Sequence, residues 1–243
     1  MTQGVKVVVT AAQDGFTGLS GALRDAGYVV MESPLIAFSP PDDWAAFDSA
    51  LAGIERFRAV VVTSPRAAAA LAARLPAKPC GVPAWVGGAA SARPLAGTFP
   101  TIHLPEDQGS TRGAAEALAD AMIRAEVGSP VLFPCGTLRR DTLIDRLAEA
   151  GIHTEPVICY TTVLASPAEA RLACAGATVV VVTSPSVARL VAAACDPAAR
   201  PALLAVGPTT AAAATAAGWP PVAVAARPTP SSLRDAILSL DRR

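Results

Sequence analysis

The sequence predicts an α/β fold built from two similar units, on two observations. Short runs of Val, Ile and Leu alternate along the chain with helical segments rich in Ala and Leu. These runs lack the polar alternation expected of strands that face water on one side, so they predict parallel strands covered by helices on both faces. The second observation is an internal repeat. Together they predict two flavodoxin-like or Rossmann-like parallel-sheet domains.

The repeat is clearest at two strand ends. Residues 60–66 read VVVTSPR and residues 180–186 read VVVTSPS, and an apolar helix is expected after each. The chain therefore contains two copies of one unit. Two further matches follow: residues 85–87 with 205–207, and Leu23–Ile36 with Leu147–Ile158.

Ten runs rich in β-branched and other apolar residues are predicted as strands, separated by helical stretches. In the first copy the strands are 5–10, 29–37, 59–63, 83–87 and 100–104, and in the second copy 130–134, 155–163, 178–183, 202–206 and 222–225.

Four strand-to-helix junctions are candidates for ligand binding, because open parallel sheets bind ligands beyond the carboxyl ends of their strands. At two junctions a serine precedes a proline, so the hydroxyl caps a backbone N–H and the proline needs no hydrogen-bond partner. Good capping alone explains this pattern. The alternative is that the helix N-termini offer free N–H groups and positive dipole ends to an anion. The junctions are residues 63–65, 87–89, 183–185 and 207–210.

Composition excludes several classes of function. The 20 basic and 20 acidic side chains give no net charge, which argues against nucleic acid or a membrane surface as a partner. The two histidines are far apart in sequence and the cysteines form no CxxC pair, so neither a metal site nor a Cys/His hydrolase is predicted. The cysteines are expected to be buried thiols: Cys80, Cys135, Cys159, Cys174 and Cys195.

The sequence also predicts a cytoplasmic protein. Its first residues lead directly into the apolar run 5–9 without the pattern of a signal peptide, and prolines and glycines interrupt the apolar stretch 201–226. Neither GxGxxG after the first strand nor GxxxxGK[ST] is present, so the sequence has no recognisable phosphate-binding loop for a nucleotide.

Several short motifs occur in order along nearly the whole chain. They are the two Thr-Ser-Pro units, Gly136 and Arg140 ahead of Tyr160, VGPTTA at 206–211 with Gly218 after it, and RPTPSSL at 227–233. In this combined order they resemble the uroporphyrinogen-III synthase family.

The resemblance implies a discontinuous architecture. One domain would comprise residues 1–37 and 165–243, and the other would comprise 38–164. The extended runs Val29–Phe38 and Glu155–Leu164 would link them as a pair of strands. A cleft between the domains and hinge freedom are also implied.

The resemblance further implies conversion of the linear tetrapyrrole hydroxymethylbilane into uroporphyrinogen III, with loss of water and inversion of ring D. No metal or organic cofactor is implied. Because the substrate closes spontaneously to the wrong isomer, the enzyme must act mainly by positioning. The substrate carries eight carboxylates, and a transient contact with the enzyme that makes it is a further expected interaction.

Two residues stand out under this resemblance. Tyr160 matches a family tyrosine and would donate a hydrogen bond to the departing hydroxyl; the alternative is a tyrosine that only fills space between the domains. Arg66 would pair with a substrate carboxylate, and its alternative is a solvated arginine at a helix start.

Seven further residues match family motifs as substrate-binding candidates. For most of them helix capping is the alternative role, and Arg139 complicates the assignment of its neighbour Arg140. The candidates are Ser64, Arg140, Ser184, Ser186, Gly207, Thr209 and Thr210.

The chain also departs from the family pattern. Residues 10–12 read TAA where relatives often have an arginine, residues 88–91 read GAAS where a threonine is expected, and Thr161 replaces a basic residue. These losses leave open a non-catalytic paralogue that binds tetrapyrroles or other anions. A different α/β enzyme using a nucleotide is a third alternative.

Overall fold

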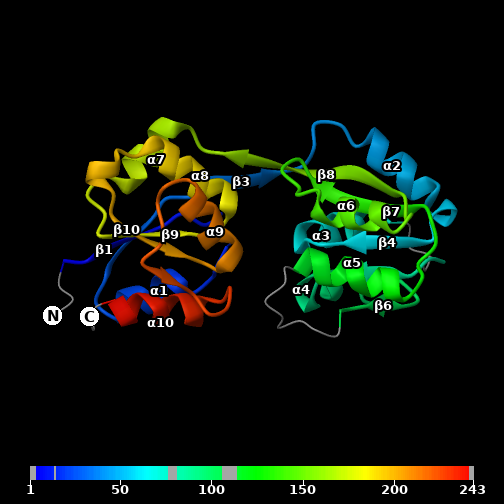
Figure 1. The fold of residues 1–243 in the computed structure, drawn as a ribbon, viewed down its shortest axis with the longest axis horizontal. Helices are drawn as coiled ribbons and strands as arrows, with labels where there is room; N and C mark the ends of the chain where they lie inside the picture. The colour runs from blue at the N-terminus through cyan, green and yellow to red at the C-terminus, as the bar shows by residue number, and fades with distance from the viewer. Residues whose placement is uncertain (1–3, 14, 76–80, 106–113, 241–243) are drawn as a thin grey trace. The chain divides into compact units, whose positions relative to one another are not determined.

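The computed structural model describes residues 4–13, 15–75, 81–105 and 114–240. The chain divides into two compact units, one made of Met1–Phe38 and Val163–Arg243 and the other of Ser39–Thr162 (Figure 1). Within the described residues, no helix is long and apolar enough to cross a bilayer.

The first unit contains a five-stranded parallel sheet in the order β11-β10-β9-β1-β2. Its inner strands consist mainly of valine, alanine and leucine and are almost fully buried. The strands are β1 (Lys6–Val9), β2 (Val29–Glu32), β9 (Val179–Val182), β10 (Ala202–Ala205) and β11 (Ala223–Val224).

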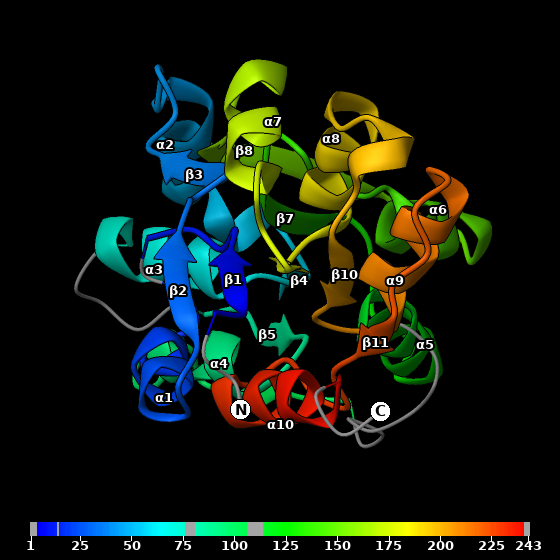
Figure 2. The ribbon, with the colours of Figure 1, turned by 90° about the vertical axis from the view of Figure 1, so that its left-hand side faces the viewer.

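Helices cover both faces of this sheet (Figure 2). Val8, Val180 and Val182 pack towards α7 (Pro167–Cys174), α8 (Pro185–Ala194) and α9 (Pro208–Ala216). The alternate strand residues pack towards α1 (Leu19–Asp25) and α10 (Pro230–Leu240). This two-sided burial explains why the strands lack polar alternation.

The second unit contains a six-stranded sheet in the order β3-β8-β7-β4-β5-β6, parallel from β8 to β6. Its core lies in two layers, with α2, α3 and α4 on one face and α5 and α6 on the other. The strands are β3 (Ile36–Ser39), β4 (Ala59–Val62), β5 (Ala84–Val86), β6 (Ile102–His103), β7 (Val131–Gly136) and β8 (Thr154–Leu164). The helices are α2 (Ala45–Ala52), α3 (Pro65–Arg74), α4 (Ala89–Ala92), α5 (Ala114–Arg124) and α6 (Thr142–Glu149).

Five strands of each sheet share one order, and β3 is an additional edge strand of the second sheet. Taken in chain order, the first unit has the flavodoxin-like arrangement 2-1-3-4-5, and the second has the same arrangement with its chain circularly permuted. Ala59 of β4 pairs with Val131 of β7, just as Val179 of β9 pairs with Val7 of β1. Strand β4 is therefore the equivalent of β9, and β7 is the equivalent of β1. The predicted α/β class with two similar parallel-sheet units is confirmed.

The sheet register corrects one of the repeat matches. Val62 pairs with Val86 in one sheet and Val182 pairs with Ala205 in the other. The counterpart of Gly207 is therefore Gly88, and the predicted match of 85–87 with 205–207 is wrong by one residue. Gly88 and Gly207 each cap the helix that follows.

The predicted strand over 29–37 is also wrong as a single element. The N–H of Ser33 and the N–H of Leu35 still bond to carbonyls beside β1, but Pro34 between them has no N–H to donate. Strand β2 therefore ends at Glu32, and β3 begins at Ile36 in the other sheet. Strands β3 and β8 are neighbours, and the boundaries between the two compact units fall within them.

The expected burial of the cysteines is confirmed for four of the five. Cys135, Cys159, Cys174 and Cys195 are buried free thiols, and Cys80 lies outside the described residues. Among the residues whose placement is described, no group of three or more His, Cys, Asp or Glu side chains could hold a metal ion.

Candidate functional site

Helix α3 begins at a capped turn that follows β4. The Ser64 Oγ accepts the backbone N–H groups of Arg66 and Ala67 at 3.2 and 3.3 Å, and Pro65 occupies the first helical position. Ser184 caps α8 in the same manner by accepting the N–H of Val187 at 3.2 Å. The predicted capping role of both serines is confirmed.

A cavity of about 200 Å³ opens at the carboxyl ends of strands in the second unit. It lies where β4 and β7 are neighbours, which is the point at which the strand order of this sheet reverses. Open α/β sheets bind their ligands at such a point. The cavity is lined by Thr63, Ser64, Gly87, Ala115, Phe133, Cys135, Gly136, Leu138, Arg139, Arg140, Leu143 and Tyr160.

Three of the predicted site residues meet at this cavity. Ser64 comes from the start of α3, Arg140 from the turn after β7, and Tyr160 from β8. A fourth, Arg66, is exposed on the first turn of α3, and its charge acts on the Tyr160 phenol. Residues distant in sequence are thus gathered at one sheet edge.

Tyr160 is half-buried, and this burial raises the pKa of its phenol above the usual value of 10.0. A hydrogen bond with the Ser64 side chain and the positive charge of Arg66 partly offset the increase in the pKa. Desolvation acts against the charged phenolate, so the side chain keeps its proton through the neutral range. Tyr160 is therefore a hydrogen-bond donor at this cavity.

The raised pKa predicts a dependence of stability on alkaline pH. Above about pH 10 the unfolded chain loses the Tyr160 proton while the folded chain retains it. The free energy of unfolding should therefore fall as pH rises from about 10 through the higher pKa of the folded state. Urea unfolding of the wild-type and Tyr160→Phe proteins from about pH 9 to 11 measures this contribution. Equal pH slopes for the two proteins would contradict the raised pKa.

The mouth of the cavity carries two adjacent arginines and an exposed leucine. The Arg139 Nε lies 3.2 Å from Asp141 Oδ1, so part of its charge is already balanced. Arg140 is exposed beside it, and Leu138 is 50% exposed. Either arginine fits the expected contact with a carboxylate, so Arg139 joins Arg140 as a candidate.

The inner wall contains residues that the sequence analysis did not single out. Phe133 and Leu143 are almost fully buried and make this wall apolar. Burial raises the pKa of the Cys135 thiol to about 11, so at neutral pH it is protonated and a poor nucleophile. Strand β7 ends at Gly136, two residues later than the end predicted at 134. Phe133 therefore lies within the predicted strand and Cys135 just beyond it.

The other five predicted residues lie in the first unit, at the starts of α8 and α9. These helices follow the neighbouring strands β9 and β10. Ser184, Ser186 and Gly207 are partly exposed and Thr209 is exposed, whereas Thr210 is only 3% exposed. Thr210 is buried on α9, as is Ser91 at the corresponding position of α4.

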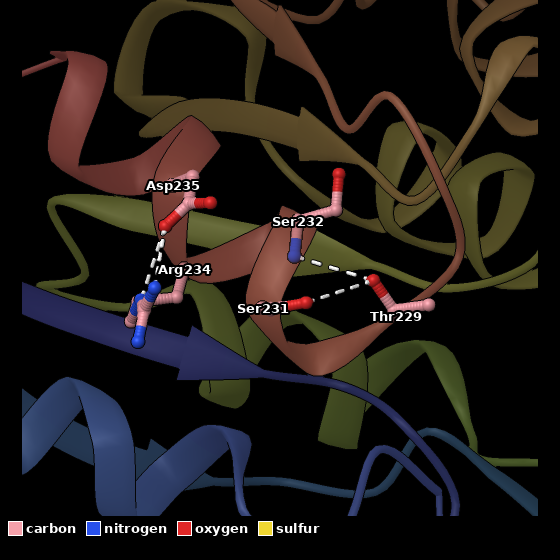
Figure 3. A network of polar contacts seen from close by, with 5 residues as sticks. All are labelled: Thr229, Ser231, Ser232, Arg234 and Asp235. Carbon is pink, nitrogen blue, oxygen red and sulfur yellow. Dashed lines mark hydrogen bonds and ion pairs between the residues drawn. The ribbon is translucent and has the colours of Figure 1, made fainter.

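The family-like segment 227–233 forms the start of α10 (Figure 3). The Thr229 Oγ1 accepts the N–H of Ser232 at 3.3 Å and lies 3.2 Å from the Ser231 Oγ. The Arg227 N–H donates to the Ser232 Oγ at 3.0 Å. These hydroxyls therefore order the helix start, which gives the segment a structural role.

A sequence comparison decides the family. The family model described as uroporphyrinogen-III synthase HemD matches residues 18–235. The chain belongs to the uroporphyrinogen-III synthase family. No curated protein matches the chain significantly by sequence.

Solved structures of uroporphyrinogen-III synthases share the fold of this chain. A mutant enzyme from Thermus thermophilus is 16% identical with a TM-score of 0.69, over 98% of this chain and 100% of that one. The enzyme from Helicobacter pylori is also 16% identical, with a TM-score of 0.64, over 97% of this chain and 99% of that one. At this identity the likeness shows the fold.

Membership of the uroporphyrinogen-III synthase family confirms the predicted resemblance. It supports the interpretation of the chain as a synthase, an enzyme of tetrapyrrole biosynthesis. The non-catalytic alternative gains no support from these comparisons.

Proposed function

We propose that this chain is a cyclising hydro-lyase that converts hydroxymethylbilane into uroporphyrinogen III. The observation that carries the proposal, beside family membership, is the protonated Tyr160 phenol at a cavity on the switch point of a parallel sheet. A phenol in this state can donate a hydrogen bond to a leaving oxygen without ionising. The reaction requires such a donor and little other acid–base chemistry.

The proposed reaction begins with departure of the substrate hydroxyl. The pyrrole that bears the hydroxymethyl group supplies the electron pair that breaks the C–O bond and loses its N–H proton, giving a neutral azafulvene. The departing hydroxide takes up one proton in exchange and leaves as water. The substituted α-carbon of ring D then attacks the exposed methylene carbon to form a spiro intermediate, which rearranges to the product with ring D inverted. Tyr160 would stabilise the departing oxygen and hold it in line.

The cavity is too small for four pyrrole rings, so it would take only one end of the substrate. We assign it the hydroxymethyl end, because Tyr160 lines it. Arg66 and Arg140 would meet carboxylates near that end.

The remaining carboxylates would be bound in part by backbone N–H groups in the first unit. Ser184, Ser186, Gly207 and Thr209 lie at the first turns of two helices, where N–H groups lack partners within the helix. Thr210 would contribute its backbone N–H, because the residue is 3% exposed and lies in the first turn of α9. Donors of this kind suit a chain with zero net charge that must bind a polyanion.

The test is the ratio of uroporphyrinogen isomers formed from hydroxymethylbilane. Hydroxymethylbilane generated in situ should yield predominantly isomer III with this protein, and isomer I with an inert protein in its place. A chelator should leave the yield of isomer III unchanged, because the proposed chemistry needs no metal or organic cofactor. Formation of isomer I alone at every protein concentration would refute the proposal.

We further propose that the reaction takes place in the cytoplasm, where the product would feed the heme, siroheme or cobalamin branches. The substrate closes spontaneously, so a transient contact with the enzyme that makes it would limit loss to isomer I. Accelerated formation of isomer III when that enzyme is present, at equal substrate concentration, would support such a contact.

A further inference from the structure

Gly136 lies where the β7–β8 ladder changes register. Cys135 pairs with Ile158, but the next pair joins Gly136 to Tyr160 and so skips Cys159. The N–H of Thr137 donates to the Tyr160 carbonyl at 3.3 Å, and the N–H of Thr162 donates to the Thr137 Oγ1 at 3.0 Å. These bonds fix the backbone on both sides of Tyr160.

The Tyr160 ring occupies the space that a side chain on Gly136 would need. A Cβ built on Gly136 would lie 2.3 Å from Tyr160 Cε2, 2.5 Å from Cζ and 2.9 Å from the phenol oxygen. Folded proteins essentially never contain carbon contacts this short. The ring therefore packs directly on the bare backbone of β7.

Backbone conformation does not explain the glycine. Gly136 is not among the glycines with positive φ and lies at the end of a β-strand, a conformation that alanine also adopts. The obstacle to a side chain at this position is therefore the Tyr160 ring, which would have to move.

Ser64 holds the other end of the same side chain. Its Oγ already accepts two backbone N–H groups, which use both of its lone pairs. Its hydrogen bond with the Tyr160 phenol lowers the pKa of that group, which ties the phenol to the start of α3.

We propose that Gly136 is a positioning residue for Tyr160: its missing side chain seats the ring at the cavity, where Ser64 orients the hydroxyl. The functional part of this inference rests on the proposed synthase activity. The structural part, that ring and glycine form one packing unit, stands independently of any activity.

The test is a double-mutant cycle with Gly136→Ala, Tyr160→Ala and the combined variant. Gly136→Ala should lower kcat by about 10- to 100-fold with little change in KM, because the displaced phenol no longer reaches the leaving oxygen. The same substitution should lower the urea midpoint of the wild type but not that of Tyr160→Ala, in which the ring is gone. The matched control is Gly21→Ala on α1, where an added Cβ meets no atom within 4 Å. That variant should keep kcat and should not lower the midpoint, because alanine favours the helix more than glycine does.

The outcomes separate this inference from the proposed function. One outcome is a protein that makes no isomer III while Gly136→Ala lowers the urea midpoint only when the Tyr160 ring is present. That result would refute the synthase activity but support the packing of the ring on Gly136. If Gly136→Ala lowered the urea midpoint equally in the wild type and in Tyr160→Ala, the packing of the Tyr160 ring on Gly136 would be refuted, whatever the activity. A wild-type kcat for Gly136→Ala in an active protein would overturn its positioning role.

Discussion

Replacing Tyr160 with phenylalanine is expected to lower kcat by about 10- to 100-fold, because the lost hydrogen bond acts on a leaving oxygen that gains charge in the transition state. The ring itself remains, so its packing on Gly136 and the shape of the cavity should persist. Binding of the product uroporphyrinogen III should change much less than turnover, since the product no longer carries the hydroxyl.

The measurement is the initial rate of isomer III formation, together with a product-binding titration. Tyr28→Phe is the matched control, because Tyr28 is the chain's other tyrosine and lies buried in the core of the first unit. An unchanged kcat in Tyr160→Phe would assign Tyr160 a structural role only.

The largest effect on stability is expected for Phe47→Ala. Phe47 is on α2, is fully buried, and packs in the cluster under α2 and α3 in the second unit. Removing its ring takes away buried apolar surface and leaves a cavity, which should lower the free energy of unfolding by about 3–5 kcal/mol. Urea unfolding followed by circular dichroism measures this loss.

Leu172→Ala provides the control for this substitution. Leu172 is on α7 and is 75% exposed, so its replacement should change the free energy of unfolding by less than about 0.5 kcal/mol. Similar losses in the two variants would contradict the assigned core. A loss for Phe47→Ala below about 1 kcal/mol would also contradict it, because the transfer free energy of the ring is lost even where the cavity closes.

The fold was predictable from sequence because two-sided burial leaves a direct trace in the strands. All-apolar runs such as VVVV at 179–182 are found where helices cover both faces of a parallel sheet. The break at Pro34 was less visible, since residues on both sides of it remain extended and apolar. The one-residue shift at Gly88 was also hidden, because only the pairing of Val62 with Val86 fixes it.

The site was predictable in part. Ser64 and Tyr160 carry recognisable chemistry at strand ends, and the fold brings them to one cavity. The apolar wall could not be inferred, because it depends on the adjacency of β4 and β7, which are distant in sequence. The burial of Thr210 likewise depends on which side of α9 faces the core. The buried side of a helix is hard to predict when the helix consists almost wholly of small residues, as α9 does.

The strand register gives Gly136 a counterpart in the other sheet. Counting on from the equivalence of Val131 and Val7, the residue at the position of Gly136 is Ala12, which carries a methyl group. The two halves are therefore equivalent as scaffolds but not as chemical environments. A gene duplication would account for the common framework, and the glycine that packs against an aromatic ring is present in one copy and replaced by alanine in the other.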